Sequence, residues 1–255
     1  MSKIVLYART IRDIGLKRSC LRIIEKFKVF LANISSSNYT FFFFRVKTKT
    51  PVFLNVLHEF KLIGKHDKKF LYKKNPNYIT FKFLNKKRVL KFPFNWNNCK
   101  WQRLWQFNLH YFEWARDWLN KCISTRSIKE EKYLIGLLID NWIFSNPFAR
   151  GDGWNSYTIS LRCRNWIWVF RCFPELATKK RLDSLWLQIY WLYLNPELAS
   201  GGNHLIENLI TLLIASMQFE GKDSKKIFNW AKNKLKSELD EQILNDGGHF
   251  ERSAA

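Results

Sequence analysis

A polar stripe interrupts one otherwise apolar stretch of the chain, and its residue types suit the binding of an acidic group. His204, Glu207 and Thr211 are spaced i, i+3 and i+7, which places them on one face of a helix. The residues around them are apolar nearly all round, so we expect this helix to be buried. Because an unsatisfied buried polar group is costly, the stripe is expected to face water, a partner or a ligand.

Two asparagines, Asn203 and Asn208, flank the stripe, and Asn203 stands at the expected start of the helix. The N-terminus of a helix is electropositive and favours an anionic group, such as the carboxylate of a sugar acid. A capping Asn203 together with a paired His204 and Glu207 accounts for the same spacing equally well. The spacing alone leaves both interpretations open.

A glycine-containing segment upstream carries residues that could complete a binding site. Residues 150–157 combine glycines, which permit tight turns, with Trp154 and Tyr157, whose rings could stack on sugars. The segment leads into a predicted helix that carries Arg162 and Asn165. We therefore expect this loop and helix to lie close to the polar stripe.

Two other groups of polar residues are weaker candidates. Asn108 and His110 lie close together in an aromatic segment, although a lone histidine is more often structural than catalytic. A pair of glycines near the C-terminus precedes the titratable residues His249, Glu251 and Arg252. Such a cluster is typical of a binding loop, with a plain turn as the alternative.

Helical periodicity begins near residue 101 and continues almost to the last residue. It predicts six helices of roughly 15–20 residues with short connections, which implies successive antiparallel hairpins and a mainly α fold. Ser127 and Glu130 form a capping box at the start of the second helix. The expected helices cover about 101–123, 127–142, 156–173, 176–194, 203–219 and 223–244.

Three regions are expected along the chain. Residues 1–68 form a basic N-terminal region, in which 3–33 has the spacing of one or two amphipathic helices. We favour a helix packed on the main domain with a solvated charged face, and a membrane-surface or partner-binding helix is the alternative. Residues 34–55 are expected to form a loop, and their aromatic part could form a strand. Residues 69–100 form a small β-hairpin region before the helical domain of 101–255.

The charge of the chain indicates a polyanionic partner. The 255 residues include 43 Lys and Arg against 21 Asp and Glu, a formal net charge of +22. Nucleic acid, an anionic membrane surface and an acidic polysaccharide all suit this excess. The basic residues are spread over the whole chain and no nucleic-acid-binding motif is present, which argues against nucleic acid. Core packing is expected to explain about two-thirds of the 12 tryptophans.

Cysteine usage and hydropathy exclude other classes. The five cysteines include no CxxC pair, so neither a disulfide scaffold nor a zinc site is expected, and no cofactor is expected. No stretch approaches the ~20 apolar residues of a membrane span. Residues 1–33 lack the continuous apolar core of a signal peptide. A cytoplasmic location is the default expectation, with the periplasm or secretion left open.

Four segments, taken in order, resemble the heparinase II/III-like polysaccharide lyases. They read LWQFNLHYF at 104–112, GWNSYTISLR at 153–162, GNHLIEN at 202–208 and GGHFERS at 247–253. The resemblance covers roughly residues 83–253. Four segments in the family's order are a far more specific signal than any one of them.

This resemblance implies an incomplete (α/α) toroid, normally followed by an antiparallel β-sandwich, and β-elimination of uronate-containing acidic polysaccharide. The reaction removes the C5 proton of a uronate and expels the O4 substituent, and it requires neutralisation of the C6 carboxylate. By resemblance, Asn203 and His204 contact that carboxylate, and Glu207 orients His204 or the substrate. The residues expected to bind substrate are Trp154, Tyr157, Arg162, Asn108, His110, His249, Glu251 and Arg252.

The reaction also requires a general base and acid. In the family, a tyrosine a few residues after the Glu-Arg-Ser block supplies this function, whereas here Ala254 and Ala255 follow the block. We expect that tyrosine and the β-sandwich to lie beyond this chain, and the chain alone to have little or no lyase activity. Nucleic-acid binding and non-catalytic glycan binding are the alternative functions.

Overall fold

The computed structural model describes residues 16–54, 71–75, 77–98, 100–123, 128–244 and 247–248. Its helices are α2 (Leu16–Ile34), α3 (Ser37–Phe43), α4 (Arg103–Tyr111), α5 (Glu113–Ile123), α6 (Ile128–Ser145), α7 (Ser156–Cys172), α8 (Lys179–Leu194), α9 (Gly202–Ser216) and α10 (Lys222–Gln242). Two 3₁₀ turns are η1 (Asp152–Trp154) and η2 (Pro174–Leu176). The strands are β1 (Leu71–Asn75), β2 (Tyr78–Phe83) and β3 (Lys86–Lys91).

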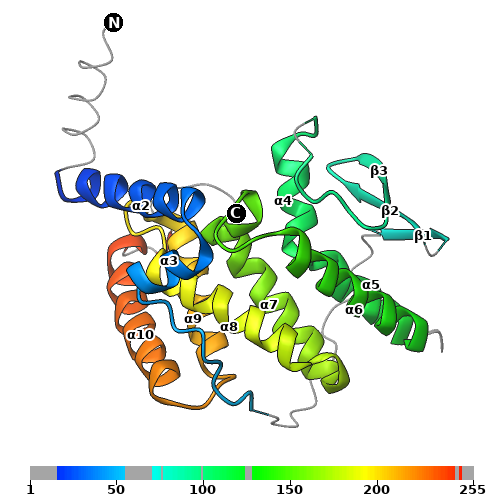
Figure 1. The fold of residues 1–255 in the computed structure, drawn as a ribbon. Helices are drawn as coiled ribbons and strands as arrows, with labels where there is room; N and C mark the ends of the chain where they lie inside the picture. Colours follow the sequence, from blue (N-terminus) through cyan, green and yellow to red (C-terminus); the bar gives the residue numbers. More distant parts are fainter. Residues whose placement is uncertain are drawn as a thin grey trace, which may run out of the picture.

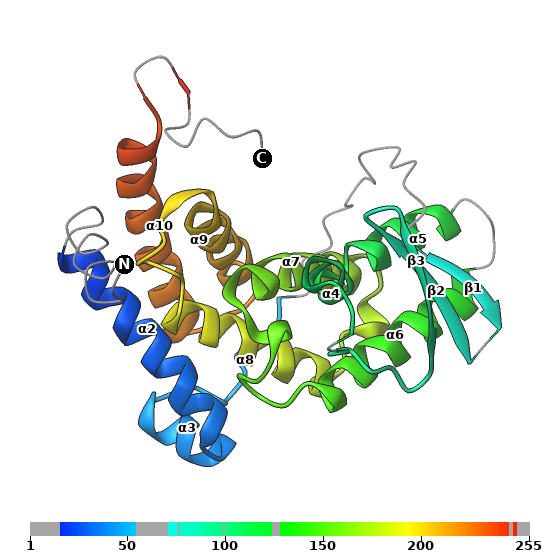
Figure 2. The ribbon, with the colours of Figure 1, turned by 90° about the horizontal axis from the view of Figure 1, so that it is seen from above.

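The helix α7 lies at the centre of a mainly helical body, with the small sheet at one edge (Figure 1). It packs against α4, α5, α8 and α9, and α9 packs against α10. Seen from above, the helices follow one another from α5 and α6 beside the sheet to α9 and α10 at the other side (Figure 2). The predicted mainly α fold with successive helical neighbours is therefore confirmed.

The helix predicted over 101–123 is two helices, because the chain turns at Phe112. This residue has a left-handed backbone, with φ of 59°. Its buried ring stacks on Trp96 at 5.5 Å and meets Trp166 edge-on at 5.4 Å. Burial of a large ring offsets the cost of a backbone conformation that non-glycine residues rarely adopt. The break separates α4 from α5 and lets α5 follow a different direction.

The aromatic segment after Ile34 is a helix where a loop and strand were expected. Ser36 caps α3, and its hydroxyl accepts a hydrogen bond from the Tyr39 N–H at 3.3 Å. The Thr40 hydroxyl donates to the Ser36 carbonyl at 3.0 Å. A run of aromatics favours strands, but a serine cap and local bonding override that preference here.

The predicted β-hairpin is confirmed, and β1 adds a third antiparallel strand in the order β1-β2-β3. The turn between β2 and β3 is made by Leu84 and Asn85, whose φ values are 50° and 59°. Two left-handed residues suit the tight turn of a hairpin. One face of β2 buries Ile79, Phe81 and Phe83. The Phe81 ring contacts Trp114 of α5 and the Phe83 ring contacts Trp105 of α4, which holds the sheet against the helices.

Most of the tryptophans are core residues, as expected. Eight of the twelve are buried, namely Trp96, Trp105, Trp114, Trp142, Trp154, Trp166, Trp186 and Trp191. The others, Trp101, Trp118, Trp168 and Trp230, are half-buried. Several buried indoles donate to fixed acceptors, which keeps the polar N–H satisfied inside the core.

The N-terminal helix is described from Leu16 onward, and it packs on the helical body through polar contacts. The Lys28 ammonium donates to the Leu194 carbonyl at 3.1 Å, and Arg18 pairs with Glu241 on α10. Its apolar residues largely face solvent, whereas a charged solvent face was the favoured expectation. The helix packs on the body and exposes Arg22 and Lys26 as expected, but most of its large apolar residues face solvent instead of the body.

We predict that one buried amide fixes the segment between the sheet and the helices. The side-chain oxygen Oδ1 of Asn141 accepts from the Phe94 N–H at 3.2 Å and from the Trp96 indole at 2.9 Å. Replacement Asn141→Ala leaves two buried donors without this acceptor and should lower the free energy of unfolding by about 2–4 kcal/mol. Urea denaturation measures the change, and the exposed Asn229→Ala on α10 is the control, expected within ~0.5 kcal/mol of the parent. Equal stabilities of the two variants would refute this role.

Candidate functional site

The helix α9 begins with an N-terminus that no side chain caps. Gly201 precedes it with φ of 63° and ψ of −150°, a backbone conformation that favours glycine. Asn203 lies in the first turn, half-buried, so the alternative in which it caps the helix is not what the structure shows. The first N–H groups of α9 are therefore available to an acceptor from outside the helix.

His204 is exposed at this N-terminus, and its ring is held by a neighbouring helix. The imidazole stacks on the Tyr157 ring of α7, with centroids 4.2 Å apart and planes 21° apart. Its Nδ1 lies 3.9 Å from Oε2 of Glu197, in the loop between α8 and α9. The Asn208 amide donates to the same Glu197 oxygen at 3.2 Å, while burial raises the pKa of Glu197. His204 thus has a defined orientation and an open face.

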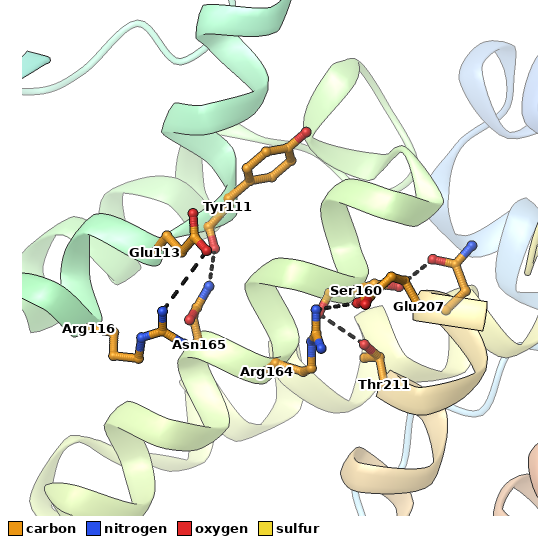
Figure 3. Close-up of polar contacts among 9 residues, drawn as sticks. Tyr111, Glu113, Arg116, Ser160, Arg164, Asn165, Glu207 and Thr211 are labelled. Carbon is orange, nitrogen blue, oxygen red and sulfur yellow. Dashed lines mark hydrogen bonds and ion pairs between the residues drawn. The ribbon is translucent and has the colours of Figure 1, made fainter. Parts of the chain in front are cut away.

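Glu207 pairs with a different partner from the one expected. Its carboxylate accepts from the Arg164 guanidinium of α7, as Figure 3 shows. The positions i and i+3 do place His204 and Glu207 on one side of α9, but His204 stacks on Tyr157 at the start of α7 and Glu207 pairs with Arg164 further along that helix. Glu207 was expected to orient His204 or the substrate, and the first of these is corrected: Glu197 is the carboxylate next to the imidazole.

The side of α7 that faces α5 and α9 carries a second stripe of functional groups. Tyr157, Leu161, Arg164, Asn165 and Trp168 recur at helical spacing along it. Most of this stripe lines a hollow of about 250 Å³, together with Glu113 and Arg116 from α5 and Ile214 and Gln218 from the α9 side. The hollow therefore lies between α5, α7 and the C-terminal end of α9.

Two tyrosines connect this hollow with His204. The Tyr111 ring meets the Tyr157 ring edge-on at 6.0 Å. The Tyr111 carbonyl accepts from the Asn165 amide at 2.9 Å (Figure 3). Burial, followed by the neighbouring Tyr157 and Glu113, raises the pKa of Tyr111. Burial and the Glu207 carboxylate raise the pKa of Tyr157. Both phenols are therefore held in the protonated form at neutral pH.

The charges at the hollow are mostly paired. Arg164 is bound to Glu207, and Arg116 lies 4.0 Å from Glu113 and 3.6 Å from Asp117. The two guanidinium groups nevertheless face the same hollow from opposite helices. They provide donors that a ligand anion could share with the protein carboxylates.

Arg162, expected to bind substrate, is completely buried and holds the scaffold instead. Its guanidinium donates to the Gln188 side chain at 2.7 Å, to the Gly153 carbonyl at 2.7 Å and to the His110 carbonyl at 3.3 Å. The group also lies over the Trp142 ring, 3.8 Å from its centroid. Burial lowers the pKa of Arg162 to about 9. Sequence spacing could not distinguish this inward direction from an outward one.

His110 and Trp154 are buried as well, so their expected place on a binding surface is also corrected. The His110 Nδ1 accepts from the Trp142 indole at 2.9 Å, and burial lowers the pKa of His110 to about 3. The Trp154 indole donates to the Asn146 carbonyl at 3.2 Å. A Cβ at Gly153 would lie 2.9 Å from the His110 Nδ1, so the glycine permits this close packing.

The other sequence candidates are less informative. Asn108 is half-buried, and its amide donates to the Leu104 carbonyl of its own helix at 2.8 Å. His249, Glu251 and Arg252 lie outside the described residues. Among the expected set, the structure thus brings together Asn203, His204, Glu207 and Tyr157.

Sequence reasoning missed Arg164, Glu197 and the hollow. The helical spacing from Tyr157 to Arg164 and Trp168 is visible in the sequence and could have indicated Arg164. Glu197 had no such signal, because it lies in a loop with a left-handed backbone of φ 63°. Its proximity to His204 depends on how that loop folds back on α9.

Two general features of the described part of the chain bear on function. Within these ranges, no group of three or more His, Cys, Asp or Glu side chains is placed to hold a metal ion. Among the helices that the structure describes, none is both long enough and apolar enough to span a bilayer.

Comparison with known proteins gives both a family and structural neighbours. The family described as Heparinase II/III N-terminus matches residues 43–255. The fold is similar to a mutant of heparan sulfate lyase HepC from Pedobacter heparinus, with a TM-score of 0.54 and 15% identity, covering 98% of this chain and 39% of that chain. Another structure of HepC gives a TM-score of 0.51 and 16% identity, covering 81% and 34%. No curated protein matches significantly by sequence.

The structural matches and the family match support different conclusions. At 15–16% identity, the structural neighbours show the fold, which is the helical toroid part of those proteins. The chain spans 34–39% of the length of these neighbours. The family match covers most of the sequence and includes all of α7 and α9. The chain belongs to the heparinase II/III family, and it corresponds to the family's N-terminal helical domain.

Proposed function

We propose that the surface formed by α7 and the N-terminus of α9 binds a uronate-containing acidic polysaccharide. In this proposal, the surface is the carboxylate-binding half of a β-eliminating lyase site. The observation that carries it is the exposed imidazole of His204 at an uncapped helix N-terminus, oriented by its stack on Tyr157. The names of the structural neighbours, heparan sulfate lyases, support the same substrate class.

The carboxylate subsite consists of Asn203, His204 and the first turn of α9. A uronate carboxylate there meets the positive end of the helix dipole, free N–H groups and the Asn203 amide. Abstraction of the C5 proton places negative charge on this carboxylate as the enolate-like form develops. Donors already in position stabilise that charge without reorganisation, which is how such a site lowers the barrier.

The rings and charges of α7 provide the groove for the polymer. Tyr157 fixes the plane of His204 and offers an aromatic surface for a sugar ring. Arg164 of α7 and Arg116 of α5 face the hollow from opposite helices and can share anionic groups of neighbouring sugar units. Arg164 also holds Glu207, which keeps α7 and α9 in register.

The described surface provides groups for only part of the proton transfer that the reaction needs. β-Elimination breaks the C5–H bond and the C4–O4 bond and forms a C4–C5 double bond, so it needs both a base and an acid. Tyr111 and Tyr157 have raised pKa values and hold their protons at neutral pH. A protonated phenol can donate to the departing O4, but it is a poor base for C5. The proposal therefore assigns substrate binding to the described surface and leaves the base to another group.

His204 should contribute to oligosaccharide binding only when the sugar carries its carboxylate. We predict that His204→Ala weakens binding of a heparin-derived oligosaccharide by roughly 5- to 20-fold, the loss of one hydrogen bond to a charged group. Isothermal titration calorimetry measures the affinity. Carboxyl-reduced oligosaccharide should bind the parent chain more weakly and should not respond to the substitution.

Controls separate the subsite from non-specific charge. Tyr157→Phe keeps the aromatic stack and should bind within about twofold of the parent, whereas Tyr157→Leu should resemble His204→Ala. Asn229→Ala, exposed on α10, should have no effect. Equal losses for native and carboxyl-reduced sugar would contradict the carboxylate subsite. Equally tight binding of random-sequence DNA, unaffected by His204→Ala, would favour nucleic-acid binding.

Turnover by the 255-residue chain should be slow at neutral pH. A tyrosine with a raised pKa is protonated at pH 7 and loses its proton only above its ordinary value of about 10. Any residual elimination that depends on Tyr111 or Tyr157 should therefore increase as the pH rises from 7 toward 10. Absorbance of the unsaturated uronate product, with heparan sulfate or alginate, measures the rate. Robust turnover at pH 7 that Tyr157→Phe leaves unchanged would contradict the expected slow turnover of this chain.

A further inference from the structure

The helix α2 presents its apolar side to solvent and its polar side to the protein. Five large apolar residues lie within about 60° of one another around the helix axis, at the geometry of 3.6 residues per turn. Their exposed fractions lie between 56% and 72%. We call this set the α2 stripe: Leu16, Ile23, Phe27, Phe30 and Ile34.

The opposite side of α2 makes the contacts with the helical body, and those contacts are largely polar. Glu25 accepts from the Ala199 N–H at 3.4 Å, and Lys28 donates to the Leu194 carbonyl. Ala32 is the buried apolar residue on this side. A helix that only packs on a domain buries its apolar side and exposes its charges. In α2 the large apolar residues are exposed instead.

The exposed apolar surface continues into the next helix. The α3 helix packs against α2 and exposes Phe42 at 84% and Phe43 at about half. In both views α2 and α3 lie at the outer edge of the helical body (Figures 1 and 2). Large apolar residues gathered at an edge indicate a surface that meets a second apolar phase or partner.

Charge distinguishes between the possible partners. Residues 16–54 contain eight Lys and Arg residues and a single acidic residue, Glu25. Glu25 lies on the side that contacts the protein, and burial raises its pKa. Arg22 and Lys26 are exposed along one flank of the α2 stripe. A second copy of this basic surface would be repelled, whereas anionic lipid headgroups would be attracted.

We propose that α2 is an interfacial helix, which lies in the headgroup region of an anionic bilayer with the α2 stripe inserted. The apolar side chains enter the acyl boundary while Arg22 and Lys26 contact lipid phosphates. The orientation requires no rearrangement of the polar contacts to α8 and α10, because these are on the other side. This association is independent of the proposed sugar-binding function and goes beyond it.

Vesicle co-sedimentation with the full chain tests the proposal. Vesicles of phosphatidylcholine containing a minority of phosphatidylglycerol should bind the chain, and vesicles of phosphatidylcholine alone should bind it much less. The double variant Phe27→Ser, Phe30→Ser should lose roughly tenfold or more in partitioning to the anionic vesicles. Both rings are more than half exposed, so circular dichroism should show an unchanged fold.

A matched control removes equally exposed apolar groups elsewhere. Tyr133, 70% exposed on α6, and Val89 on β3 lie away from α2, and the double variant Tyr133→Ser, Val89→Ser should retain vesicle binding. Heparin binding measured on the same proteins should not change with Phe27→Ser, Phe30→Ser. That separates failure of this proposal from failure of the sugar-binding one.

Each other outcome would overturn the proposal. These outcomes are no binding to either vesicle, equal binding to both vesicles, or equal loss in the control variant. A concentration-dependent dimer that Phe27→Ser, Phe30→Ser abolishes, without vesicle binding, would assign the α2 stripe to a second copy of the chain instead. Light scattering after size-exclusion chromatography detects that dimer.

Discussion

The buried guanidinium of Arg162 sets where the functional helices can lie. A charged group without solvent is stable in a fold only when its hydrogen bonds are satisfied and its charge is offset. Arg162 meets this requirement with acceptors from α8, from η1 and from the end of α4, and with the face of Trp142 on α6. Four elements are therefore fixed around one point on α7.

That anchoring leaves the other side of α7 free for function. Because Arg162 points inward, Arg164 and Asn165 lie on the side that lines the hollow between α5 and α9, and Tyr157 faces His204. The Arg164–Glu207 ion pair then fixes α9 against this side, and the stack of His204 on Tyr157 sets the imidazole at the helix N-terminus. The same helix provides the interior of the domain and the polar wall of the candidate site.

Much of the architecture could be predicted from local sequence. The helices from α7 to α10 have regular apolar spacing and are followed within a few residues by glycine, proline or asparagine, so their extents were nearly correct. The break at Phe112 had no signal, because a left-handed phenylalanine is stabilised only by the rings that surround it. The helix α3 was missed because a serine cap outweighed an aromatic run that favours strands.

The site was predictable in its residue types and less so in its contacts. Asn203, His204 and Tyr157 lie together as expected, because helix spacing and a loop before a helix are local features. The direction of Arg162 and the partner of Glu207 depend on neighbours 26 and 43 positions away, which spacing within one helix cannot reveal. Glu197 reaches His204 only through the fold of a loop.

The central claim is that the first turn of α9 and the adjoining side of α7 are the sugar-binding surface. Hydrogen–deuterium exchange of the chain, with and without a saturating uronate oligosaccharide, tests this most directly. The account predicts slower exchange of backbone amides in 201–208 and 156–165, and little effect with carboxyl-reduced oligosaccharide. Protection confined to the lysine-rich α10, or equal protection by both sugars, would contradict it.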